Sequence, residues 1–143
     1  AFVAIIAFYN ATGKDNVDDF AGLADRSPFI AMSLTAALFS LAGLPFFAGF
    51  ITKFYLFIAA AEADMLWLAG AAIANSLISL YYYLIVIRQM YMQPAAEPGK
   101  IGVSRVTGGL LGALVVGTVA IGIYPVPLVD LIETATAAIL PGV

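Results

Sequence analysis

Hydrophobic and polar positions alternate along this chain in long blocks, with extended apolar segments separated by short polar ones. About 20 apolar residues in a helix cross a hydrocarbon core of about 30 Å. The pattern therefore predicts an all-α fold, a polytopic bundle of transmembrane helices. In order, the predicted elements are a helix end at 1–9, a loop with a short surface helix at 10–27, a broken transmembrane helix at 28–61, a transmembrane helix at 65–92, a loop at 93–105, a transmembrane helix at 106–124 and a terminal interfacial helix at 127–140.

The composition indicates a membrane protein and excludes several kinds of redox and metal site. Hydrophobic residues make up 63% of the 143 residues and charged residues only 10%, against about 25% charged in a soluble domain. The chain has no cysteine and no histidine, which excludes thiolate redox chemistry, iron–sulfur or haem ligation and the usual zinc sites. We therefore expect no catalytic residue, cofactor or metal in this chain and no nucleic-acid partner. Because residues 1–9 are already apolar and lack an initiator Met, we also expect a longer protein.

The segment 28–61 contains its own interruption. As one straight helix it would be roughly 50 Å long, which tilting does not easily accommodate. Gly43 lowers helix propensity, and Pro45 removes a backbone donor and clashes with the preceding turn. Gly49 lets another helix or a water molecule approach closely. We predict two half-helices with a break near Gly43 and Pro45.

Lys53 is the only charged residue in that segment. It lies about 12 Å from the polar boundary near Ala61, roughly twice the reach of a lysine side chain. Two interpretations remain open. Lys53 either forms a structural ion pair with a carboxylate on a neighbouring helix, or handles protons beside a broken helix, as ionisable residues of membrane transport sites do.

Three polar residues of the segment 65–92 fall on one helical face: Asn75, Ser79 and Tyr82 follow each other at spacings of four and three. The simpler interpretation, which we favour, is that they form hydrogen bonds between helices and hold the bundle together. The alternative is a polar face that lines a hydrated path beside Lys53.

The basic residues predict the orientation. With three alternating spans, five of the six fall on the side of the loops 10–27 and 88–105, and none falls on the other side. Positive loops stay in the cytoplasm, so we expect a multi-pass protein of the plasma membrane with a non-cytoplasmic C-terminus. The five residues are Lys14, Arg26, Arg88, Lys100 and Arg105.

Four segments resemble one family, subunit N of the proton-pumping NADH-quinone oxidoreductase, or respiratory complex I. The segment SLAGLPFFAGFITKFYLF at 40–57 is similar to the family's signature. The others are DDFAGLADRSP at 18–28, which resembles the loop before that signature, NSLISLYYYL at 75–84, which looks like the next helix, and GIYPVPL at 122–128, which resembles the C-terminal ending. Together they cover nearly the whole chain.

The resemblance implies the C-terminal part of an antiporter-like fold, in which two inverted repeats each contain a discontinuous helix. The segment 28–61 would be the second broken helix, and Lys53 would match its proton-channel lysine. Subunit M typically has glutamate there, and subunit L follows the lysine with an acidic pair where this chain has Phe54 and Tyr55. One departure is that the family often has two prolines at the break, whereas Phe46 follows Pro45 here.

The resemblance also implies a function. The chain would belong to a membrane-arm subunit of a complex I-type translocase, passing protons through Lys53 while other subunits reduce quinone. NADH, FMN, iron–sulfur clusters and quinone would then be bound by partner subunits of a hetero-oligomer embedded in lipid. The family's other key groups, a glutamate–lysine pair and a central lysine, would precede Ala1. The alternatives are a component of a related multisubunit cation/proton antiporter, or a structural membrane spacer with a permanently paired Lys53.

Overall fold

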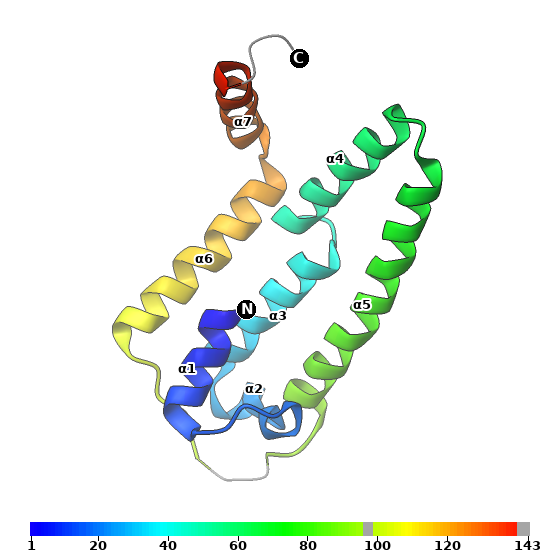
Figure 1. The fold of residues 1–143 in the computed structure, drawn as a ribbon. Coiled ribbons are helices and arrows are strands. Elements are labelled where there is room, and N and C mark those ends of the chain that lie inside the picture. The colour runs from blue at the N-terminus through cyan, green and yellow to red at the C-terminus, as the bar shows by residue number, and fades with distance from the viewer. Residues whose placement is uncertain (96–98, 140–143) are drawn as a thin grey trace.

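The computed structural model describes residues 1–95 and 99–139, and within these ranges every regular element is a helix. The all-α prediction is therefore confirmed. Position 140 of the predicted terminal helix lies outside the described residues. The elements are α1 (Phe2–Thr12), the 3₁₀ helix η1 (Val17–Phe20), α2 (Leu23–Arg26), α3 (Pro28–Ala42), α4 (Ala48–Glu62), α5 (Leu66–Met92), α6 (Arg105–Ile123) and α7 (Val126–Ile139) (Figure 1).

Helix α3 occupies the middle of the bundle (Figure 1). It packs against α1, α5 and α6, while α4 continues beyond it and packs against α5 and α6. The buried apolar side chains come mainly from α1, η1, α2 and α3, together with Met90 near the end of α5 and Leu111 on α6. The largest fully buried ones are Phe8, Leu23, Ile30, Leu34 and Met90.

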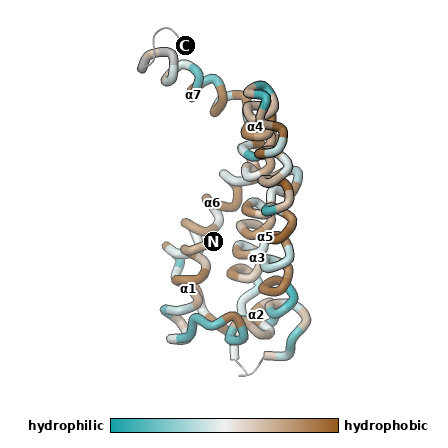
Figure 2. Tube along the Cα trace, turned by 45° about the vertical axis from the view of Figure 1, so that its right-hand side comes forward, coloured by the Kyte–Doolittle hydropathy of each residue, from teal (hydrophilic) through white to brown (hydrophobic). Residues whose placement is uncertain are grey.

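Hydrophilic residues gather at the two ends of the bundle, in the segment between α1 and α3 and on α7, and hydrophobic residues dominate between them (Figure 2). Among the described helices, α5 and α6 are each long and apolar enough to cross a membrane. Helices α3 and α4 have 15 residues each, which is short for a separate crossing. That α3 and α4 together form one discontinuous transmembrane helix stays a prediction.

The N-terminal elements differ from the expected ones. Helix α1 extends beyond residue 9 to Thr12 and ends where Gly13 adopts φ 72°, a left-handed conformation that favours glycine. The single surface helix expected within 10–27 is divided into η1 and α2. Gly22, with φ 65°, lies between them and turns the chain. Its added Cβ would come within 2.5 Å of the Ala95 backbone, so the loop passes too close for any other residue.

Backbone hydrogen bonds join the loops at this end of the bundle. The Gly22 N–H donates to the Gln89 carbonyl at 3.3 Å, and the Ile101 N–H donates to the Arg26 carbonyl at 2.9 Å. The Arg26 Nε also donates to the Gly99 carbonyl at 3.3 Å. These bonds fix the ends of α5 and α6 relative to α3, which positions the helices around the candidate site.

Candidate functional site

The chain stops being helical at 43–47, between α3 and α4. Gly43 has φ 82°, and its N–H donates to the carbonyl of Ser40 at 3.0 Å, while the Leu44 N–H donates to the carbonyl of Phe39 at 3.0 Å. This pair of bonds is the Schellman ending of a helix, in which a left-handed glycine satisfies the last carbonyls and a proline often follows. Gly43 and Pro45, both predicted to break the helix, lie in this segment.

Phe46 also adopts a left-handed conformation, with φ 74°. Such a conformation costs a residue other than glycine roughly 1–2 kcal/mol, so packing around the break must stabilise it. The same conformation concerns position 46, where the family often has a second proline and this chain has Phe46. A proline ring fixes φ near −65°, so proline at position 46 is incompatible with this path of the chain. Sequence reasoning missed the conformation, because nothing in the phenylalanine side chain indicates it.

The two half-helices touch each other directly beside the break. The Gly49 N–H, at the start of α4, donates to the Ser40 Oγ on α3 at 3.1 Å. A Cβ at position 49 would overlap the carbonyl group of Ser40. The helix that approaches Gly49 closely is therefore α3.

Lys53 reaches back from α4 to the end of α3. Its Nζ donates to the carbonyl of Leu41 at 2.9 Å and to that of Ala42 at 3.0 Å. The last carbonyls of a helix lack intrahelical partners and carry the negative end of the helix dipole, so they favour a cation. A Cβ at Gly43 would lie 2.8 Å from the Lys53 Cδ, so the lysine stem crosses the break where there is no side chain.

A small cavity of about 120 Å³ adjoins Lys53. Ser76 on α5 supplies its only hydroxyl among the described residues, and the other side chains are largely apolar. The Ser76 Oγ donates to the Ala72 carbonyl at 2.9 Å, which leaves its lone pairs free to accept. The cavity is lined by Ala42, Gly43, Phe50, Lys53, Phe54, Phe57, Ile73 and Ser76.

The three polar residues predicted on α5 do not line this cavity. Asn75 and Tyr82 are exposed, and Ser79 donates to the Asn75 carbonyl at 2.9 Å. The ring of Tyr82 meets that of Tyr81 edge-on at 5.7 Å. Ser76, one position after Asn75, lines the cavity instead, because one step along a helix rotates a side chain by about 100°. A role of the three residues in a hydrated path stays a prediction.

The surroundings of Lys53 differ from a salt-bridged site. Within the described ranges Lys53 forms no ion pair, and carbonyl oxygens are its hydrogen-bond acceptors. The side chain is half-buried in this chain, because α4 packs along one side only and has no fully buried residue. In the part of the chain that the structure describes, no three acidic side chains form a group that could hold a metal ion.

Comparison with known proteins identifies the family. The transmembrane domain described as NADH:quinone oxidoreductase/Mrp antiporter matches residues 1–79, more than half of the chain. The chain belongs to this antiporter-like family. The matched residues of this chain include α1, α3, α4 and about half of α5, and therefore both Lys53 and Ser76.

Relatives in this antiporter-like family are subunits named N, which confirms the resemblance found in the sequence. The chain is 45% identical to the NADH-quinone oxidoreductase subunit N of Moorella thermoacetica, over 91% of the chain and 28% of the relative. It is 41% identical to the same subunit of Dehalococcoides mccartyi, over 98% and 29%. It is 38% identical to the F(420)H(2) dehydrogenase subunit N of Methanosarcina mazei, over 89% and 26%. The chain thus spans less than a third of these relatives.

Proposed function

We propose that this chain is part of a membrane-arm subunit of a complex I-type NADH:quinone oxidoreductase, and that Lys53 passes protons through it. The observation that carries the proposal is the position of Lys53, whose ammonium group is held by two carbonyls at the end of α3 and adjoins a cavity. An ionisable group at an interrupted helix is the arrangement expected of a transport site.

The chemistry follows from the hydrogen bonds. A protonated lysine has three N–H donors, and the carbonyls of Leu41 and Ala42 accept two of them. The third is available to an acceptor in the cavity, where Ser76 presents its lone pairs. When Lys53 releases a proton, its bonds to the carbonyls lose their charge assistance, and rebinding a proton restores them. One cycle moves one proton, and a change of charge nearby would drive it.

The redox chemistry in this proposal belongs to other subunits. NADH, FMN, iron–sulfur clusters and quinone would be bound by partners in a hetero-oligomer, and quinone reduction there would drive the proton movement here. The protein would be multi-pass in the plasma membrane, with its C-terminus on the non-cytoplasmic side. One relative is a subunit of an F(420)H(2) dehydrogenase, and the role proposed for this chain does not depend on which electron donor the assembly uses.

The experiment compares the wild-type assembly with Lys53→Ala and Lys53→Arg in sealed vesicles, at matched rates of quinone reduction. Arginine keeps the positive charge but does not deprotonate in proteins. We expect both variants to move fewer protons per quinone reduced, because each lacks a group that releases a proton. Full pumping by both assembled variants would show that Lys53 carries no proton.

A second candidate is a component of a multisubunit cation/proton antiporter. The observation in its favour is that the matching family includes Mrp antiporter subunits as well as the oxidoreductase. Purification of the assembly from native membranes separates the two. Flavin and iron–sulfur absorbance in the purified material favours the oxidoreductase, and antiporter subunits without bound redox centres favour the second candidate.

A further inference from the structure

The end of α3 has two carbonyls that the backbone does not use. Earlier carbonyls of the last turn accept from backbone N–H groups just past the helix. The carbonyl of Leu41 would take its partner from position 45, but Pro45 has no N–H. The carbonyl of Ala42 would take its partner from Phe46, and this bond does not form in the part of the chain that the structure describes. These two carbonyls are therefore left to a donor from elsewhere.

Lys53 supplies that donor from the next helix. Its Nζ lies 2.9 Å from the Leu41 carbonyl oxygen and 3.0 Å from that of Ala42. The two oxygens thus hold one primary ammonium group between them. Because both belong to the backbone of α3, their positions depend on the path of the chain at the break and not on the lysine side chain.

The space in front of these carbonyls is occupied by the lysine stem. Gly43 leaves room for it, because a Cβ there would lie 2.8 Å from the Lys53 Cδ. The cavity of about 120 Å³ beside the break is lined by Lys53 itself. Shortening Lys53 to alanine removes three carbons and the nitrogen. The space that they leave would join this cavity.

The surroundings favour a cation that has N–H donors. Among the described residues no acidic side chain lines the cavity, so the negative potential comes from the end of α3 itself. The Ser76 Oγ donates to the Ala72 carbonyl and keeps its lone pairs for another donor. A primary ammonium group has three N–H bonds and matches this set of acceptors.

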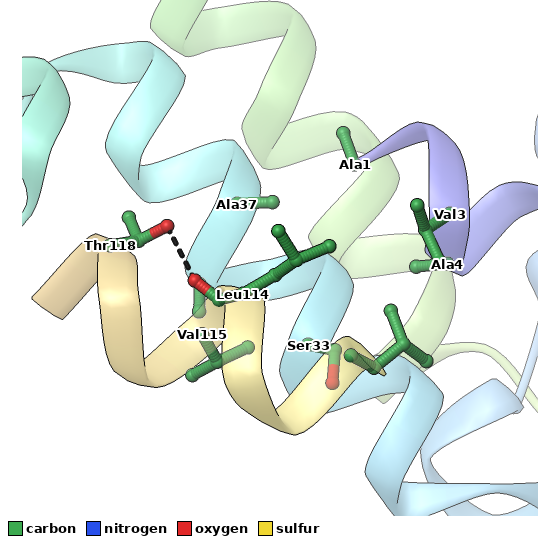
Figure 3. A pocket seen from close by; sticks show the side chains of 10 residues that line it. Ala1, Val3, Ala4, Ser33, Ala37, Leu114, Val115 and Thr118 are labelled. Atoms are coloured by element: carbon green, nitrogen blue, oxygen red, sulfur yellow. Dashed lines mark hydrogen bonds between the residues drawn. The ribbon is translucent and has the colours of Figure 1, made fainter. Parts of the chain in front are cut away.

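The cavity between α1, α3 and α6 has a different character. Figure 3 shows that the side chains labelled around it are mostly apolar, and the Thr118 Oγ1 donates to the Leu114 carbonyl at 2.8 Å. No charged side chain lines this cavity within the described ranges. Of the two cavities, only the one at the break therefore favours a cation.

We propose that the end of α3 is a binding site for a primary ammonium group, complete without Lys53, and that it takes a free n-propylammonium ion when that side chain is removed. This ion supplies the same three carbons and nitrogen that Lys53→Ala lacks. In the wild type the lysine excludes it, because a tethered group loses less freedom on binding than a free ion does. The backbone at the break is then the fixed part of the site, and Lys53 is its replaceable part.

Binding of the free ion does not rest on the proposed function, but a second expectation does. If Lys53 carries protons, the bound ion can do the same, because it is also a primary amine. We then expect n-propylammonium to restore part of the pumping that Lys53→Ala loses. In its neutral form the amine crosses hydrocarbon, so it reaches a site within the membrane.

The test measures amide hydrogen exchange in the whole purified assembly, in a peptide covering 38–46 at the end of α3. Lys53→Ala empties the site. Lys53→Met also lacks the ammonium group but keeps the space filled, so it is the matched control. We expect n-propylammonium chloride, at about four times its dissociation constant, to slow exchange in Lys53→Ala about fivefold, because a ligand that binds only the closed state stabilises it by that factor. It should change nothing in Lys53→Met or in the wild type.

Two further probes separate the features of the ion. 1-Propanol fills the same space without a charge, and tetramethylammonium carries the charge without an N–H donor, so neither should slow exchange. The proposal is overturned if either probe slows exchange equally, if Lys53→Met responds as Lys53→Ala does, or if n-propylammonium leaves Lys53→Ala unchanged. Lys53→Ser leaves a similar space and is used should Lys53→Ala fail to assemble. Slowed exchange without restored pumping supports the binding site and counts against the proposed function alone.

Discussion

The ammonium nitrogen of Lys53 lies 2.9 Å from the carbonyl oxygen of Leu41, so a residue of α4 caps the end of α3. The lysine follows the break in sequence, yet its side chain returns across it. The charge is therefore held by the helix end that the break creates. This hydrogen bond thus links the position of Lys53, the candidate proton carrier, to the geometry of the break. We expect a change in either one to alter the other.

Replacing Lys53 by Met, which keeps the unbranched stem, removes this cap. We expect the unfolding free energy to fall by about 1 kcal/mol, less than the roughly 1.5–3 kcal/mol typical of hydrogen bonds to a charged group, because Lys53 is half-exposed. Amide hydrogen exchange in a peptide covering 38–46 reports on the end of α3 and should become faster. Lys100→Met removes a positive charge from an exposed loop and is the control. Equal exchange in the two variants would show that the cap adds no stability.

The sequence predicted where the helix is interrupted, but it did not predict which residues form contacts across the interruption. Gly43 and Pro45 act through their own backbone preferences, which are local and visible in a sequence. The partners of Lys53 are carbonyls 11 and 12 positions earlier, which meet it only after the chain has turned. The choice of Ser76 over Asn75 depends on how α5 is rotated against α4, and packing alone decides that.

We expect Gly43 to be needed both for its left-handed conformation and for the space that it leaves for the Lys53 side chain. Gly43→Ala and Gly13→Ala place alanine at φ 82° and φ 72°, so both carry a similar strain of about 1–2 kcal/mol. Only at position 43 does the new methyl group meet another side chain, the Cδ of Lys53 at 2.8 Å, whereas position 13 is open. We therefore predict that Gly43→Ala lowers the number of protons pumped per quinone reduced and that Gly13→Ala does not. A ratio reduced equally by both would point to strain alone.

The contact between Ser40 and Gly49 is expected to hold the two half-helices together. Ser40→Ala leaves the Gly49 N–H without its acceptor, at a cost of about 1 kcal/mol. Ser104→Ala is the matched control, because its Oγ accepts from the Thr107 N–H at the start of α6, and losing that cap costs a similar amount. Both variants should unfold more easily, but only Ser40→Ala should speed hydrogen exchange across 43–50. Unchanged exchange there would show that other contacts hold the break closed.

The last prediction concerns the packing of α6 on the break. A Cβ at Gly122 would overlap the backbone of Phe46 and Phe47, and a backbone segment cannot move aside as a flexible side chain does. Gly122→Ala should therefore separate α6 from the break and lower the unfolding free energy by about 1–3 kcal/mol, as overpacking does. Gly117→Ala, on the same helix with open space around it, should show no such loss. Thermal unfolding of the purified assembly measures both, and equal stability of the two variants would mean that α6 does not press on the break.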